Sequence, residues 1–452
     1  MFGHIYNQLL KEVKPVWYYY FQNESIKNYF SDYDKMSKEE RNIIPLSKDY
    51  SDKRMRSLDA SFIAWNKGYI DIDSKKKYSS NFSINSIPLN DHYIFLRRMF
   101  KPIWSYYFLI NRILTFKNPL NELIAFWNAI DTKRVSLYEP HFKREDYDSY
   151  FSKIVQSNPL ISVIIPTYNR YENLVSVLSD LNLQNYTNFE LLVVDQSEPF
   201  EKSVYEIFQG KLILIKQVEK ELWRARNNAI KKSKGDYLLF LDDDSKISPD
   251  WILQHLKCID YFKADISAGV SLSVIGAPIP VHYNYFRWAD QLDTGNVLIR
   301  RTVFNKCGLF DQKFEKMRMG DGEFGLRCLI NGFKSINNPL ASRTHMKTAT
   351  GGLREIGGWD GLRPKSWLSP KPIPSVLYFF RKYWGDKAAL HFIVQTIPVS
   401  LLPYRFKGIK KVSIISFMLF ILLFPIIFIQ VILSWKIANR MLEEGSNIER
   451  IR

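Results

Sequence analysis

Three adjacent carboxylates end a buried apolar run in the middle of the chain. The stretch GDYLLFLDDDSKISPDW begins at Gly235, and Asp242, Asp243 and Asp244 follow its apolar residues directly. Like charges at this spacing repel one another, so we expect a cation beside them. Carboxylate and phosphate oxygens are the ligands that Mn²⁺ and Mg²⁺ prefer in proteins. The acidic triplet, Asp242–Asp244, therefore predicts a site for Mn²⁺ or Mg²⁺ that bridges a diphosphate, with Asp242 and Asp244 as metal ligands.

Two further motifs carry groups that could do chemistry. In GDGEFGLR, Asp321 stands between two glycines and Glu323 follows it, so either carboxylate could accept a proton from an attacking hydroxyl. In THMKTATGGLRE, His345 stands in a basic, glycine-containing loop with Lys347 and Arg354, which we expect to close over a diphosphate. Structural alternatives stay open for both motifs. Glu323 could instead be an acid in the first turn of a helix, favoured by the helix dipole, and His345 could be a structural histidine.

Alternating strands and helices must position these groups. From Leu160 onward, apolar runs predict strands over residues 161–166, 189–195, 211–218 and 236–242. Helical spacing between them predicts helices over residues 171–184, 223–235 and 249–262. The alternation predicts an α/β fold with a mainly parallel, doubly wound sheet. Ligands bind beyond the carboxyl ends of such strands, where three polar clusters converge: Pro166-Thr167-Tyr168-Asn169, Asp195 and the acidic triplet.

In order and spacing these blocks resemble the family 2 glycosyltransferases of the GT-A fold, in their bacterial, membrane-associated type. The resemblance covers roughly Pro159 to Arg354 and includes ARNNAI and TGNVLIRRTVFNKCGLFDQKF. It implies an inverting, metal-dependent glycosyltransferase, hexosyltransferase-like, that moves one sugar from a nucleotide-sugar, expected to be UDP-linked. The implied acceptor is a lipid-linked saccharide or a glycan in cell-surface polysaccharide synthesis.

The resemblance also implies a role for each candidate residue. Pro166, Thr167 and Tyr168 would line the nucleobase pocket, and Asp195 would accept a hydrogen bond from uracil N3–H. The remaining donor-binding residues would be Arg226, Asp242, Asp243 (the spacer), Lys347 and Arg354, and the metal ligands Asp242, Asp244 and His345. Asp321 would be the catalytic base, with Glu323 as the alternative. Gly320 departs from the family's Glu-Asp pair, and Trp288 and Asp293 would contact the acceptor.

Net charge and one apolar stretch predict that the chain associates with a membrane. The 452 residues carry a net charge of +17, which predicts anionic partners. Residues 412–435 contain no charge, and as one helix of roughly 36 Å they would cross the ~30 Å hydrocarbon core or re-enter it. We expect the enzyme at the inner (plasma) membrane with its catalytic domain on the cytoplasmic face. Three cysteines without paired spacing predict reduced thiols.

The predicted organisation has five parts. A mostly helical region of unknown role covers residues 1–155, and its stretch 93–114 has the pattern of a membrane-surface helix or a packing helix. The catalytic domain covers residues 156–355, a basic membrane-proximal region 356–411, the apolar helix 412–435 and a polar tail 436–452.

Two other functions stay open. A nucleotidyltransferase-like enzyme on a related fold would need a glycine-rich loop after the first strand, which PTYNRYEN lacks. A catalytically weak membrane scaffold would not need the retained acidic motifs. No nucleic-acid partner is expected, because the charge is dispersed and no recognition module is present.

Overall fold

The chain forms two compact units. The computed structural model describes residues 2–21, 29–30, 32–71, 87–273, 279–347, 351–353, 360–363, 366, 368–402 and 410–451. The first unit consists of Met1–Asp146 with Asn284–Asp290, and the second unit of Tyr147–Tyr283 with Gln291–Arg452. The short segment Asn284–Asp290 therefore belongs to the first unit, although the chain on both sides of it belongs to the second.

The first unit is mostly helical in its described residues, as predicted. Its helices are α1 (Phe2–Leu10), α2 (Lys38–Asn42), α3 (Lys53–Asn66), α4 (Leu89–Met99), α5 (Ile103–Leu114) and α6 (Pro119–Asn128), and it also holds the two-residue strand β7 (Arg287–Trp288). The single helix expected over residues 93–114 is wrong, because α4 and α5 are separate. Pro102 explains the break, since its ring removes a backbone donor and disfavours a helical residue before it.

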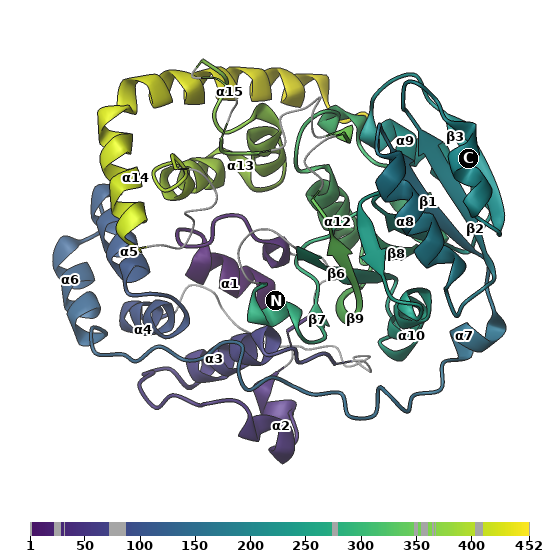
Figure 1. Cartoon of the computed structure of the whole chain (residues 1–452). Helices are drawn as coiled ribbons and strands as arrows, with labels where there is room; N and C mark the ends of the chain where they lie inside the picture. Colours follow the sequence, from purple (N-terminus) through teal and green to yellow (C-terminus); the bar gives the residue numbers. More distant parts are fainter. Residues whose placement is uncertain are drawn as a thin grey trace. The chain divides into compact units, whose positions relative to one another are not determined.

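A mixed sheet forms the centre of the second unit (Figure 1). Its strands are β1 (Ile161–Thr167), β2 (Phe189–Asp195), β3 (Lys211–Lys216), β4 (Tyr237–Leu241), β5 (Ser245–Ile247), β6 (Ile266–Ser273), β8 (Asn296–Arg300) and β9 (Ser335–His345). They lie in the order β3-β2-β1-β4-β8-β6-β9-β5. The first four pair in parallel, as the strand–helix alternation predicted. The β4–β8, β6–β8 and β5–β9 pairs are antiparallel, which the sequence did not reveal.

Helices cover both faces of this sheet. They are α7 (Lys153–Ser157), α8 (Tyr171–Asn182), α9 (Leu222–Lys232), α10 (Trp251–Tyr261), α11 (Arg301–Cys307) and α12 (Gly320–Ile330). On one face, Val163 of β1 and Leu239 of β4 belong to the same apolar cluster as Leu178 of α8 and Leu256 of α10. On the other face, the Phe240 ring of β4 lies 5.9 Å from the Phe304 ring of α11. The α/β fold class with a doubly covered sheet is confirmed.

The last three helices of the second unit are α13 (Pro374–Thr396), α14 (Lys410–Leu422) and α15 (Phe424–Glu444). The uncharged stretch 412–435 is therefore two helices and not one, and α14 runs in a different direction from α15 (Figure 1). Pro425 explains the break, because it is tolerated in the first turn of a helix and not in its interior. Among the described residues, α15 is the one helix long and apolar enough to cross a membrane, by length and composition alone.

Candidate active site

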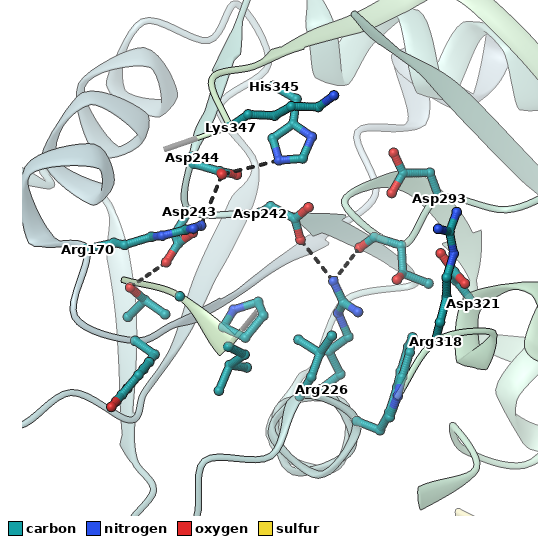
Figure 2. Close-up of a pocket in the computed structure, with 18 of the residues that line it drawn as sticks. Arg170, Arg226, Asp242, Asp243, Asp244, Asp293, Arg318, Asp321, His345 and Lys347 are labelled. Atoms are coloured by element: carbon teal, nitrogen blue, oxygen red, sulfur yellow. Dashed lines mark hydrogen bonds and ion pairs between the residues drawn. The ribbon is translucent and has the colours of Figure 1, made fainter. Parts of the chain in front are cut away.

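A cavity of about 440 Å³ opens at the carboxyl ends of β1 and β4 (Figure 2). It is lined by eleven residues that the sequence analysis singled out: Pro166, Thr167, Tyr168, Arg226, Asp242, Asp243, Asp244, Asp293, Asp321, His345 and Lys347. It is also lined by eight others: Arg170, Leu222, Trp223, Thr294, Arg318, Met319, Gly352 and Leu353. The polar clusters expected at the strand ends therefore open on one hollow, except for Asp195.

Strand pairing brings distant parts of the sequence to this edge. The apolar β4 ends at Leu241, so the acidic triplet follows at its carboxyl end. The antiparallel pair of β5 and β9 places Ser245 opposite His345. The Met346 N–H also donates to the Asp244 carbonyl at 2.9 Å. This register holds the His345 imidazole beside the Asp244 carboxylate, although the two residues are 101 positions apart.

Three arginines neutralise the acidic triplet. The Arg226 and Arg343 guanidiniums approach Asp242 at 3.0 and 2.9 Å, each on a different carboxylate oxygen. The Arg170 guanidinium lies 3.0 Å from Asp244 and 3.4 Å from Asp243. The repulsion that led us to expect a cation is thus offset by the chain's own side chains. The case for a metal ion depends instead on how closely the candidate ligand atoms converge at the cavity.

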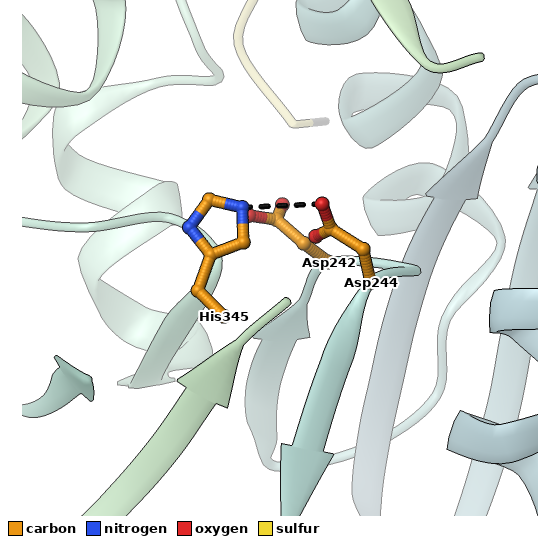
Figure 3. Close-up of side chains that lie close together, drawn as sticks. All are labelled: Asp242, Asp244 and His345. Carbon is orange, nitrogen blue, oxygen red and sulfur yellow. Dashed lines mark hydrogen bonds and ion pairs between the residues drawn. The ribbon is translucent and has the colours of Figure 1, made fainter. Parts of the chain in front are cut away.

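Those ligand atoms come from Asp242, Asp244 and His345 (Figure 3). One oxygen of each carboxylate and one imidazole nitrogen lie within 4.8 Å of one another, and His345 Nε2 is 3.2 Å from Asp244 Oδ2. The Asp242 side chain is a quarter exposed, while the side chains of Asp244 and His345 are buried. Two carboxylates and one imidazole on one side of a polar cavity fit a divalent cation.

The pKa values of the three acids of the triplet are shifted in different directions. Although burial alone would raise both values, Arg343 and Arg226 hold the pKa of Asp242 below its ordinary value, and His345 and Arg170 do the same for Asp244. Burial raises the pKa of Asp243 to about 7, and Arg170 opposes that rise. The Thr167 hydroxyl donates to Asp243 at 2.8 Å. Asp242 and Asp244 are therefore the charged acids of the triplet and the candidate ligands, and Asp243 joins the triplet to the end of β1.

Asp321 and Glu323 lie in different surroundings. Asp321 lines the cavity in the first turn of α12, and its pKa is raised by burial and then by the Asp293 carboxylate. Glu323 is fully buried outside the cavity. Its carboxylate pairs with Arg327 at 2.9 Å and accepts from the Tyr383 hydroxyl of α13 at 2.6 Å. Of the two acids considered for the base, Asp321 is the one that faces the cavity.

Two glycines allow close approaches at this site. A Cβ on Gly320 would lie 2.4 Å from the Trp223 ring, so the indole occupies the space a side chain would need there. This packing accounts for Gly320 at the position where the resembled family has glutamate. A Cβ on Gly295 would lie 2.1 Å from Asp242 Oδ2 and 2.3 Å from Arg343, so this glycine makes room for their ion pair.

Several expected residues lie elsewhere or outside the described chain. Asp195 is buried and does not line the cavity. Its oxygens accept from the Tyr171 and Tyr205 hydroxyls at 2.8 and 2.7 Å and from the Ser197 N–H. Trp288 is buried in the first unit, where its ring lies 4.5 Å from the Tyr29 ring. Arg354 lies outside the described residues.

Sequence reasoning named Arg226 but missed three other cationic residues near the triplet, namely Arg170, Arg343 and Arg318. Arg170 directly follows the Pro-Thr-Tyr-Asn block, so its position in the motif was a usable signal. Arg343 precedes His345 by two residues, and residues two apart on a strand share a face. The exposed Arg318, which borders the cavity just before α12, gave no such signal.

Comparisons with known proteins address the family. The model of the family described as Glycosyl transferase family 2 matches residues 162–317. The amylovoran biosynthesis glycosyltransferase AmsB of Erwinia amylovora is 34% identical over 217 residues, which are 42% of this chain and 71% of that protein. The glycosyltransferase AglE of Haloferax volcanii is 33% identical over 118 residues, 25% of this chain and 39% of that protein.

Two solved structures are similar to this chain at lower sequence identity. The mannosyltransferase PcManGT of Pyrobaculum calidifontis, in complex with GDP-Man and Mn²⁺, has a TM-score of 0.44 and 14% identity, covering 66% of this chain and 93% of that one. S. aureus TarS 1-349 in complex with UDP-GlcNAc has a TM-score of 0.38 and 18% identity, covering 58% of this chain and 71% of that one.

Proposed function

The chain belongs to glycosyltransferase family 2, and from that premise we propose that it is an inverting, metal-dependent enzyme that transfers one sugar from a nucleotide-sugar. The proposed donor is UDP-linked. The proposed acceptor is a lipid-linked saccharide or a glycan of a cell-surface polysaccharide. We place the enzyme at the cytoplasmic face of the inner membrane, in keeping with its charge of +17 and its apolar C-terminal helices.

One observation carries this proposal. Asp242, Asp244 and His345 face the same cavity as Asp321, although Asp242 and Asp244 lie in the β4–β5 connection, His345 ends β9 and Asp321 lies in α12. An inverting transfer needs these two kinds of group on opposite sides of a sugar. One must neutralise the leaving diphosphate, and the other must take the proton of the acceptor hydroxyl.

The proposed reaction is a single displacement. The acceptor oxygen forms a bond to the anomeric carbon as the bond from that carbon to the diphosphate oxygen breaks. The hydroxyl proton passes to the Asp321 carboxylate, and the nucleoside diphosphate leaves with the electron pair. A divalent cation held by Asp242, Asp244 and His345 would supply electrostatic stabilisation of the diphosphate. Lys347, which lines the same cavity, would add positive charge there.

The nucleobase side of the cavity is proposed from its lining. Pro166 and Thr167 end β1 and Tyr168 follows it, and the Lys220 ammonium lies 5.3 Å from the Tyr168 ring centre. Arg226 contributes positive charge but is already engaged by Asp242 and the Thr294 carbonyl. Asp195 is buried outside the lining of the cavity and accepts from two tyrosine hydroxyls, so we propose it as a support of this wall instead.

A donor screen tests the proposal. We expect release of nucleoside diphosphate from one or two nucleotide-sugars of a panel, dependent on Mn²⁺ or Mg²⁺. The Asp244→Ala variant should lose this activity, because it removes one of two carboxylate ligands from the cation. Asp250→Ala, a half-buried acid a few residues away that does not line the cavity, is the matched control and should keep the activity. Equal turnover in EDTA, or in Asp244→Ala, would remove the metal ion from the mechanism.

A further inference from the structure

The hairpin formed by α5 and α6, Ile103–Asn128, is apolar on both of its sides. Its inward side packs on the first unit, where the Phe108 and Phe126 rings lie 5.1 and 5.9 Å from the Tyr93 ring. Its outward side carries ten large apolar residues that are exposed: Ile103, Tyr106, Ile110, Ile113, Leu114, Phe116, Leu120, Leu123, Ile124 and Trp127. We call this outward side the hairpin face.

A helix that simply packs on a protein core has a different pattern. In α8, the residues Leu174, Val177, Leu178 and Leu181 are buried, and the residues away from the core include Glu172 and Ser176. That is the usual arrangement of one apolar stripe and one polar face. On the hairpin face the most exposed side chains are instead Phe116 at 98%, Leu114 at 72% and Leu120 at 65%. Contiguous apolar surface of this kind marks an interaction site.

The charges around the hairpin face indicate which kind of partner it fits. Within residues 101–134 the exposed charged residues are four cations, Lys101, Lys117, Lys133 and Arg134, and one acid, Asp131. The other acid of this stretch, Glu122, is buried and paired with Arg112 at 2.7 Å. Exposed Trp127 and Tyr106 add aromatic rings with polar atoms. Apolar residues bordered by such rings and by cations suit the interface of an anionic bilayer.

We propose that the hairpin face binds an anionic lipid bilayer at its interface, as a membrane contact separate from the C-terminal helices α14 and α15. Neither α5, with 12 residues, nor α6, with 10, is long enough to span the hydrocarbon core. The hairpin therefore lies in the plane of the interface and inserts its outward side chains. A bilayer accounts for the basic border, which a self-associating apolar face would not need.

Fluorescence of a labelled full-length chain tests this contact. Phe116→Cys places a thiol at the tip of the hairpin, and the three native cysteines are buried, so an environment-sensitive label goes to position 116. Leu46→Cys, at an exposed apolar residue of the same unit outside the hairpin, is the matched control. With phosphatidylglycerol–phosphatidylcholine vesicles, the label at 116 should shift to the blue and be quenched by nitroxides on the acyl chains. The label at 46 should do neither.

A substitution set gives a second measurement. Leu114→Gln, Leu120→Gln and Trp127→Gln together should weaken vesicle binding at least about tenfold, because each removes apolar surface from the inserted face. These side chains are exposed, so the fold should be unaffected. A label at 116 that stays in water while the chain sediments with vesicles would overturn the proposal. So would a blue shift that appears without vesicles and grows with protein concentration, since that identifies a second copy as the partner.

Discussion

At the scale of single residues, surroundings separate two acids that lie two positions apart. Asp321 faces the cavity with Asp293 and Arg226 nearby, whereas Glu323 is fully buried between Arg327 and Tyr383. A buried carboxylate held by a guanidinium and a hydroxyl stabilises the fold, and its lowered pKa makes it a poor proton acceptor. The two acids should therefore respond differently to removal of their charge.

We expect Asp321→Asn to lower kcat by about 10²–10⁴-fold while donor affinity changes little, because it removes the base and keeps the side-chain shape. Glu323→Gln should have its main effect on stability, lowering the free energy of unfolding by about 1–3 kcal/mol, because it weakens the buried pair with Arg327. Steady-state kinetics, nucleotide titration and urea denaturation separate the two outcomes. A larger loss of kcat in Glu323→Gln than in Asp321→Asn would assign the base to Glu323.

The pH dependence of transfer should report Asp321. Burial and the Asp293 carboxylate raise its pKa, with Arg318 and Arg226 opposing. Because a base acts in its charged form, kcat/KM should fall as the pH drops through this raised pKa, above the ordinary aspartate value of about 4. Asp293→Asn removes a neighbouring negative charge and should move this acid limb to lower pH. A limb at the same pH in both proteins would show that another group controls the rate.

At the scale of elements, the start of α12 is fixed by its packing against α9. Trp223 of α9 is buried against Gly320, and its indole N–H donates to the Phe314 carbonyl at 3.0 Å. Met319, the residue before the helix, has φ of 86°, so the chain enters α12 in the left-handed region. The position of Asp321 follows from this contact, since it is the next residue after Gly320.

We expect Gly320→Ala to disturb both stability and rate. The added methyl would lie 2.4 Å from the Trp223 ring, so either the indole or the helix start must move. Overpacking of this kind costs about 1–3 kcal/mol in the free energy of unfolding. A shift of Asp321 should also lower kcat, and Trp223→Phe in the same chain should restore part of both losses. Urea denaturation and kinetics that match the wild type would contradict this account of Gly320.

At the scale of the whole molecule, the C-terminal helices have a packed side and an exposed apolar side. One stripe of α15 is buried, namely Ile427, Gln430, Ser434, Ala438 and Met441, and Arg381 of α13 lies over the Trp435 ring. Beyond α15 the C-terminal tail contacts an earlier part of the second unit, where the Leu309 N–H donates to the Glu449 carbonyl at 2.8 Å. The outward residues of α14 and the first part of α15 are apolar and exposed.

Removal of this region would therefore combine two effects. Deleting residues 405–452 should release the chain from membranes, but it would also remove the tail contacts. Met418→Gln, Ile421→Gln and Leu422→Gln together are sharper, because these side chains are 62–75% exposed and outside the packed stripe. We expect weaker co-sedimentation with anionic vesicles at an unchanged melting temperature. Sedimentation equal to that of the wild type would contradict a membrane role for α14.

The sequence by itself determined the four parallel strands β1 to β4 and the polar residues at their ends. The apolar runs predicted β1 and β2 to within a residue, and the order of acidic motifs after them predicted the family. These features depend on neighbours in the chain, since strand and helix periodicity and the polar residues that end an element are local properties. Asp242, Asp244, Asp321 and His345 were named from local motifs and from the family resemblance that those motifs carry, and the cavity brings them together.

Only the tertiary structure decided which charged side chains pair with one another and which of the candidate acids line the cavity. The β5–β9 register places His345 and Arg343 beside the triplet, and no local pattern gives the partner of a strand. In the folded chain, Asp195 accepts from two tyrosine hydroxyls and Glu323 pairs with Arg327. The segment Asn284–Asp290 belongs to the first unit, although the chain on both sides of it belongs to the second. Ion pairs and burial depend on the distance between side chains in space, which pairing of remote segments sets and separation in sequence does not.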